Sequence, residues 1–164
     1  MKLDSLEQLF LMELADLQDA ERQLIHALPG MAAAASSPEL REAFEDHLGV
    51  TQLQSQRLEE IISQLRRPPK AKTCEGMKGL LREGDEAVKA GGDPAVRDAA
   101  LIAAAQRVEH YEMAGYGCAR TFAELLGNGA AAKLLQQSLD EESSADRKLT
   151  RLAREVVNVQ AQSA

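Results

Sequence analysis

The 164-residue sequence has no tryptophan, only 3% aromatic residues and two cysteines, and each shortage narrows the possible folds. A core without large aromatic side chains must be built from Leu, Ala, Val and Ile, which suits packed helices better than a β-sandwich. Cys74 and Cys118 lie far apart and form no CxxC pair, so we expect two reduced thiols rather than a structural zinc site. Because apolar residues still make up 45% of the chain, the sequence predicts one all-α domain over residues 1–164.

The sequence also lacks an excess of basic residues and any long apolar run. Its net charge is −7 and its isoelectric point is near 5.0, so no nucleic-acid or membrane partner is expected, because both need concentrated Lys and Arg. The only basic cluster, residues 66–72, is expected to be a solvated loop. No apolar stretch approaches the ~20 residues that span a bilayer, and residues 1–10 lack the apolar core of a secretory signal. We therefore expect a cytoplasmic protein.

Apolar residues recur at steps of three and four along most of the chain, which indicates amphipathic helices. The predicted helices cover residues 4–35, 37–66, 74–90, 94–126 and 129–157. Short turns join the first helix to the second and the fourth to the fifth, whereas a long connection carries the short helix 74–90. Two antiparallel hairpins joined by one long crossover have the connectivity of a ferritin-like four-helix bundle.

Local signals at the helix ends support these boundaries. Asp4 is the predicted N-cap of the first helix, because Glu7 follows it in the spacing of a capping box. The dipeptide Ser37-Pro38 is a strong start signal for the second helix, with Ser37 as N-cap and the proline at the first helical position. Pro29 is expected to kink or loosen the first helix, although residues 31–35 could continue it beyond a bend.

Polar side chains interrupt the apolar row near the middle of every long helix. Glu109 and Glu112 share one face with Ile102, Ala105 and Tyr116, so two carboxylates sit in the centre of a face whose ends are apolar. Helices of about 30 residues are ~45 Å long, and antiparallel helices share their midpoints, so the polar positions should converge on one layer. These positions are Glu21, His47, Thr51, Gln54, Glu109, Glu112, Glu142 and Asp146.

A cation is the expected occupant of this layer. Burying unpaired carboxylates is costly, and the inward rows offer no Lys or Arg to neutralise them. Several carboxylates with one imidazole form a ligand set suited to iron or manganese. The predicted metal ligands are Glu21, His47, Glu109, Glu112, Glu142 and Asp146, with Thr51 and Gln54 as hydrogen-bonding neighbours.

The alternative is a metal-free polar core, in which carboxylates share protons or pair with Arg side chains. Taken singly, a residue such as Glu21 or His47 is more often a partly wet or core residue than a ligand, and only the coincidence across four helices favours a metal. Tyr111 and Tyr116 are expected to be packing residues with the hydroxyl at an edge.

Four segments resemble the YciE/YciF family of bacterial ferritin-like proteins over nearly the whole chain. They are Glu21 to Leu24, Ala43 to Thr51, Arg97 to Glu112, and Ala131 to Leu135 with Glu141, Glu142 and Asp146. The resemblance implies a four-helix bundle with an added short helix, usually dimeric, linked to bacterial stress responses and without a settled biochemical activity. More distantly, Glu109-x-x-Glu112 is similar to a helix of rubrerythrin-type di-iron sites, which implies Glu21 and Glu142 as the carboxylates from two other helices.

Two departures from these patterns bear on function. Gly49-Val50 stands where family members carry an acidic pair, and Ala145 stands where ferritin-type di-iron helices carry His, which favours a single metal ion over a two-metal oxidase site. The first hypothesis is a ferritin-like protein whose iron or manganese reacts with peroxide or O₂. The alternative is a non-catalytic structural or interaction protein whose polar core sets helix register. DNA protection by a cage fits poorly with the net charge of −7.

The expected assembly is a homodimer, largely because of the resemblance. The helix at 94–126 has an Ala-rich side that would permit another helix to approach closely. The residues on this side are Ala99, Ala100, Ala103 and Ala104.

Overall fold

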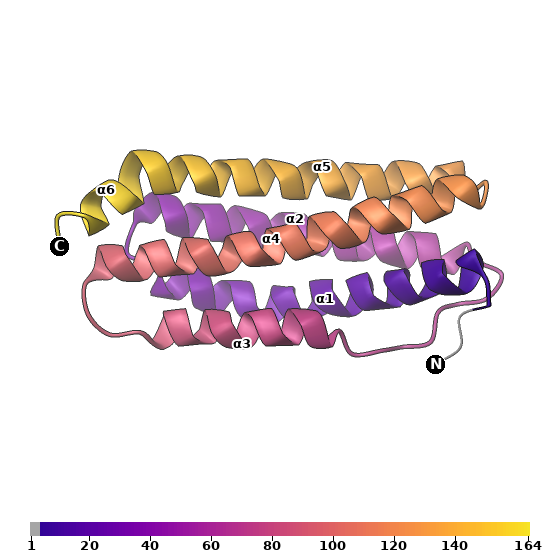
Figure 1. The fold of residues 1–164 in the computed structure, drawn as a ribbon, viewed down its shortest axis with the longest axis horizontal. Helices are drawn as coiled ribbons and strands as arrows, with labels where there is room; N and C mark the ends of the chain where they lie inside the picture. Colours follow the sequence, from indigo (N-terminus) through magenta and orange to yellow (C-terminus); the bar gives the residue numbers. More distant parts are fainter. Residues whose placement is uncertain (1–3) are drawn as a thin grey trace.

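Four long helices lie side by side in the computed structural model, which describes residues 4–164 (Figure 1). The elements are α1 Leu6–Ala34, α2 Pro38–Ser63, α3 Glu75–Lys89, α4 Pro94–Leu125, α5 Gly129–Leu152, the π-helical turn Ala153–Val157 and α6 Asn158–Ala161. The described residues contain no strand, which confirms the all-α prediction. Residues 1–3, which the predicted domain includes, lie outside the described part. Within residues 4–164, none of the helices combines the length and the apolar character needed to cross a bilayer.

The bundle is built from two helical hairpins. α1 packs along α2, and α4 packs along α5, while contacts of α1 with α4 and of α2 with α5 join the hairpins. Residues 64–93 cross from one hairpin to the other and carry α3, which lies against α1 and α4 (Figure 1). The predicted connectivity, a bundle with a long crossover that carries an added short helix, is therefore confirmed.

The helix starts follow from their capping residues, with one correction. Ser37 caps α2 by accepting a hydrogen bond from a backbone N–H of its first turn, and Pro38 is the first helical residue, as predicted. The prediction of Asp4 as N-cap of α1 is wrong, because Ser5 Oγ accepts the N–H of Gln8 at 3.2 Å. Gln8 Oε1 in turn accepts the backbone N–H of Asp4 at 2.9 Å. The N-cap therefore stands one residue later than predicted, and the Gln8 side chain caps the N–H of the residue before it.

α1 continues through its proline, and α5 ends before its predicted boundary. Pro29 is exposed, and α1 continues through it to Ala34 because Leu28 and Met31 on either side are buried in the core. At the other end of the chain, the predicted helix end at residue 157 is instead a π-helical turn followed by α6. The π turn contains one buried residue, Val157, which joins the apolar core.

Two apolar clusters fill the interior, one toward each end of the bundle. One cluster joins the end of α1 to the starts of α2 and α4 and to the end of α5, and it includes Leu28, Phe44, Ile102 and Leu149. The other joins the opposite ends of the same helices and includes Leu14, Leu58, Tyr116 and Leu135. Most of the buried polar residues lie between these clusters, whereas Ser37 and Asp98 are buried at the turn from α1 to α2.

α3 is anchored at its N-terminal end by hydrogen bonds to α1 and α4. The backbone N–H of Cys74 donates to Asp19 at 2.7 Å, and the Tyr111 hydroxyl donates to Asp16 at 2.6 Å while lying 3.0 Å from Cys74 Sγ. Gly76 is required here, since a Cβ at this position would lie 2.7 Å from the Tyr111 ring. Cys74 is buried, Cys118 is exposed, and both are free thiols, as expected.

The Ala-rich side of α4 is divided between the bundle and solvent. Ala104 is buried, and it faces α3 at Gly84, whereas Ala100 and Ala103 are exposed. Only part of this side is therefore open to a second chain.

Candidate metal centre

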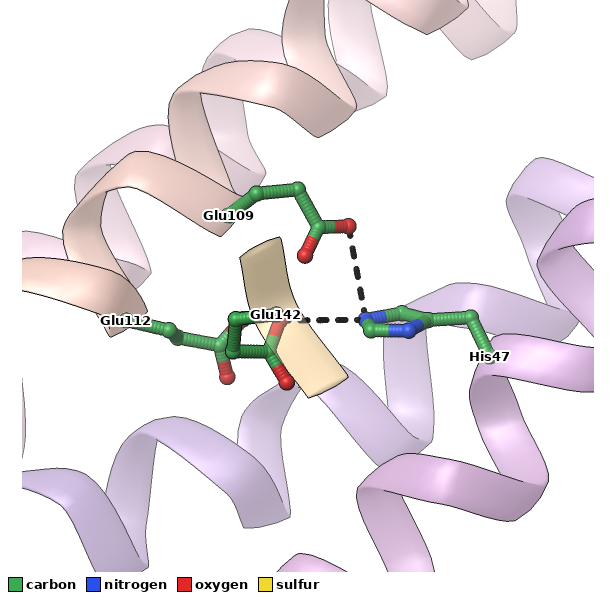
Figure 2. Close-up of side chains that lie close together, drawn as sticks. All are labelled: His47, Glu109, Glu112 and Glu142. Carbon is green, nitrogen blue, oxygen red and sulfur yellow. Dashed lines mark ion pairs between the residues drawn. The ribbon is translucent and has the colours of Figure 1, made fainter. Parts of the chain in front are cut away.

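Four ligand-type side chains from three helices meet between the two apolar clusters. His47 comes from α2, Glu109 and Glu112 from α4, and Glu142 from α5. One ligand atom from each residue lies within 4.8 Å of those from the other three, and all four residues are buried. His47 Nε2 is 3.4 Å from Glu109 Oε1 and 3.8 Å from Glu142 Oε2, and Figure 2 marks both ion pairs with dashed lines. We refer to these four residues as the His/Glu group.

The helical repeat explains why these residues converge. Glu109 and Glu112 are three residues apart on α4, so they lie on one face and one turn apart. Figure 2 shows both side chains extending from α4 toward the histidine on α2. The Thr51 hydroxyl bonds back to the carbonyl of His47 at 2.9 Å, so Thr51 is a buried hydrogen-bonding neighbour, as predicted.

Glu21 lies beside this group on α1, as the sequence predicts, and it is fully buried. The Tyr116 hydroxyl donates a hydrogen bond to one Glu21 oxygen, and the other oxygen has no hydrogen-bond partner among the described residues. Glu21 and Glu112 are close enough to perturb each other's pKa. Tyr116 is therefore more than the packing residue that the sequence suggests, because its hydroxyl is buried against a carboxylate instead of reaching an edge.

Asp146, like Glu21, is a predicted ligand that lies outside the four-residue group. Its carboxylate accepts a hydrogen bond from Gln106 at 3.0 Å and lies 3.3 Å from His110 Nε2. Its side chain is partly exposed, and His110 is exposed. Asp146 stands four residues after Glu142, so it shares roughly the same side of α5, but polar partners on α4 hold it at the rim of the layer.

Two further polar residues surround the group without neutralising it. Gln54 is buried and donates its side-chain N–H to Glu142, which supports its predicted role as a hydrogen-bonding neighbour. Arg57 is directed to Glu141 instead, with guanidinium–carboxylate distances of 2.6 and 2.7 Å. Among residues 4–164, no Lys or Arg forms an ion pair with Glu21 or with the His/Glu group. A metal-free core would be expected to pair its carboxylates with Arg side chains, but Arg57 pairs with Glu141, which is outside the group.

Burial and mutual repulsion shift the acidity of these side chains. Burial raises the pKa of Glu21 to about 8, and the negative charge of Glu142 adds to this effect. Burial likewise raises the pKa of Glu109 and of Glu112 well above the usual range, and again Glu142 contributes. The pKa of His47 is lowered, chiefly by burial, so the imidazole is neutral and available as a ligand. A divalent cation would reverse these shifts, because it favours the ionised carboxylates.

The donor atoms left without partners test whether a metal ion suits the site. Most of the buried oxygens and nitrogens with no hydrogen-bond partner among the described residues belong to Glu21, His47, Glu109, Glu112 (both oxygens) and Glu142, and the others are on Gln54, Arg97 and Arg120. Orphaned buried polar atoms are rare in native proteins, and here they cluster on the residue types that bind metals. The residues present therefore fit a hard or borderline cation such as iron or manganese.

A pocket beside the site was not predicted from the sequence. It has a volume of about 220 Å³, opens between α2 and α5, and reaches His47 and Glu109. Val50 and Ala145, the two positions where the sequence departs from the family and di-iron patterns, both line it. The only available signal was the small size of these two residues, and a small residue does not by itself indicate a cavity.

Comparisons with known proteins agree with the fold and with the resemblance. Residues 5–162 match DUF892, a domain of unknown function. The chain is 43% identical over 164 residues to Protein YciF of Escherichia coli K12, with 99% of each covered. It matches the crystal structure of the E. coli stress protein YciF with a TM-score of 0.92, covering 95% of this chain and 99% of that one.

Two further solved structures are similar. YcfI from Rhodopseudomonas palustris is 38% identical, with a TM-score of 0.86 over 91% of this chain and 95% of that one. A Xanthomonas campestris protein at 19% identity shares the fold, with a TM-score of 0.75 over 97% of this chain and 98% of that one.

Proposed function

This chain belongs to the DUF892 family and is a relative of YciF, and we propose that it is a stress-response protein that binds iron or manganese in its His/Glu group. The stress role rests on the relative whose crystal structure is described as that of a stress protein. The metal rests on this chain's own residues. The observation that carries it is the set of orphaned donor atoms in the layer between the two apolar clusters.

The ligands in this proposal are His47, Glu109, Glu112 and Glu142, with Glu21 next to them. A bound iron or manganese ion would supply a Lewis-acidic and redox-active centre for reaction with peroxide or O₂.

The surrounding residues orient the ligands and close the layer at its two ends. Tyr116 fixes one oxygen of Glu21, and Gln54 fixes one oxygen of Glu142, which leaves the second oxygen of each carboxylate free to coordinate. The apolar clusters close the layer toward both ends of the bundle, which strengthens the charge interactions within it.

Metal binding in this site should release protons. The raised pKa values of Glu21, Glu109 and Glu112 mean that these carboxyls retain protons near neutral pH until a cation displaces them. Affinity should therefore rise with pH through the pKa of Glu21, about 8.

The direct test is the metal content of untagged protein purified without chelators from cells supplemented with iron or with manganese. We expect stoichiometric metal in the wild type and its loss in Glu109→Gln and in Glu112→Gln, which keep the side-chain shape but remove the charge. Glu124→Gln is the matched control, since it makes the same change on the same helix at an exposed position. Metal-free wild-type protein, or unchanged metal in both buried variants, would overturn the proposal, and a value near two ions per chain would make the site di-iron-like.

A non-catalytic structural bundle is the second candidate, and one observation favours it. Val50 and Ala145 border the site without offering a ligand atom, so α2 contributes only His47 to the group. Under this reading the polar layer sets helix register, as buried polar groups do in some bundles. Stoichiometric metal that survives dialysis against a chelator would exclude it.

A further inference from the structure

We propose that the pocket between α2 and α5 binds the alkyl chain of a small amphiphile whose hydroxyl-bearing head faces His47 and Glu109, so that the substrates of the site are alkyl hydroperoxides rather than hydrogen peroxide. The substrate assignment rests on the proposed function. The binding of an alkyl chain rests on the pocket alone and can be tested without a metal.

The pocket is polar at its two ends and apolar between them. Its inner end is formed by His47 and Glu109, which are buried. Its outer end carries the ion pair of Lys148 with Asp46, whose side chains are 38% and 63% exposed and 2.8 Å apart. The walls between are mostly the apolar side chains of Ala43, Phe44, Val50, Ala145 and Leu149, and Glu141 and Ser144 are the other polar residues that line the pocket. A ligand that matches this lining has one polar end directed inward and an apolar body.

The inner end has unused hydrogen-bonding capacity. His47 Nε2 and Glu109 Oε2 are buried, line the pocket and have no hydrogen-bond partner among residues 4–164. In the metal-free protein, a neutral imidazole nitrogen and a carboxyl oxygen can each accept an O–H group. An alcohol or a hydroperoxide can donate its O–H here, whereas an alkane or an ester has no O–H to donate.

The size of the pocket argues for a carbon chain. At about 220 Å³ it exceeds the apolar cavity of ~150 Å³ that holds benzene in an engineered protein. Hydrogen peroxide would leave most of the apolar wall without a partner. Each methylene that is buried against the wall should tighten binding about fourfold until the pocket is full.

The two small residues in the wall create this space. Val50 and Ala145 are half-buried on facing helices, and a longer side chain at either position would extend into the pocket. Val50 and Ala145 stand where the related sequence patterns have metal-ligand residues, and the same two small side chains leave space for an organic group.

The test uses unbranched primary alcohols from propanol to heptanol, which are unreactive analogues of the hydroperoxides. Their dissociation constants are measured by NMR titration on protein as purified and after removal of metal by a chelator. We expect about fourfold tighter binding per methylene in both preparations, with a plateau at the chain length that fills the pocket. tert-Butyl hydroperoxide should displace a bound alcohol, and hydrogen peroxide at the same concentration should not.

Variants locate the binding. Ala145→Phe should abolish the dependence on chain length, and Ala145→Leu, which changes less volume, should end the series at a shorter alcohol. Ala130→Phe is the control, because it adds the same bulk at an exposed position of α5. Affinity that does not vary with chain length, or that is unchanged in folded Ala145→Leu protein, would overturn the inference even if metal is bound. A normal alcohol series in protein that never binds metal would instead refute the peroxide function and leave the alkyl site standing.

Discussion

The buried carboxyls predict that the metal-free protein loses stability as the pH rises from 6.5 to 8. The pKa of Glu21 is about 8 in the folded protein, against 4.5 for an ordinary glutamate, so in this range the folded chain holds a proton that the unfolded chain has already released. Stability falls with pH wherever the folded state binds more protons. The loss begins near the unfolded pKa and is complete only above the folded one.

The magnitude follows from this shift. Each pH unit changes the free energy of unfolding by ~1.4 kcal/mol while only the unfolded state is ionised, so Glu21 alone accounts for about 2 kcal/mol between pH 6.5 and 8. Glu109 and Glu112, whose pKa values are also raised, add to this loss. His47 does not oppose it here, because its pKa is lowered from 6.5 and its contribution is fully present above that pH. The lowered pKa of Asp16 acts only below 3.8.

The assay is urea unfolding followed by circular dichroism in chelator-treated protein at several pH values in this range. Glu21→Gln should remove the part of the dependence that Glu21 contributes, since an amide has no proton to lose, and Glu124→Gln should leave it unchanged. Saturating metal should also flatten it, because the bound cation keeps the carboxylates ionised in the folded state. A free energy of unfolding that stays constant or increases from pH 6.5 to 8 in the metal-free wild type would refute the reasoning.

Three other perturbations probe the metal and the helix connections. Added Mn(II) or Fe(II) at 100 times its dissociation constant should stabilise the folded protein by about 2.7 kcal/mol, measured as a higher melting temperature. Glu109→Gln should abolish this increase, and an equal increase in that variant would mean that the ion binds elsewhere. Asp98 is buried on α4 and accepts hydrogen bonds from the backbone N–H groups of residues 36 and 37, between α1 and α2. Asp98→Ala should therefore lower the free energy of unfolding in urea by about 1–3 kcal/mol. A loss below about 0.5 kcal/mol would contradict this role. Gly76→Ala should cost about 1–3 kcal/mol because of its clash with Tyr111, whereas Gly79→Ala on the same helix, with open space around it, should stabilise by about 0.5–1 kcal/mol.

The fold could be predicted from the sequence because the signals that define the helix ends are local. The Ser37-Pro38 start and the reversal at Gly127, which has a φ of 74°, are set by backbone sterics within a few residues. The helix cap at Ser5 instead of Asp4 shows the limit of this approach, since two good capping residues in a row compete and only their backbone conformations decide.

The site was partly predictable for a similar reason. Glu109 and Glu112 were found because helical periodicity fixes which face they share. Asp146 lies outside the group that the sequence predicts for it. Helical periodicity indicates which side of a helix a residue occupies, but it does not show that Gln106 and His110 hold the Asp146 carboxylate at the rim of the layer. The pocket was not predictable at all, because it depends on the sum of several small side chains on two helices.

The buried carboxyls of the polar layer have only part of their hydrogen bonds, and this weighs against a purely structural role for the layer. A buried polar network that sets register stabilises a fold only when its members are satisfied, and a half-satisfied network is worse than an apolar core. Here Tyr116 and Gln54 satisfy one oxygen of Glu21 and of Glu142, while the second oxygens and both oxygens of Glu112 have no partner among the described residues. Bundle stability alone would favour apolar side chains at these positions. Most of the unsatisfied atoms belong to residues that a cation would satisfy, which supports the proposed metal site over a purely structural role for the layer.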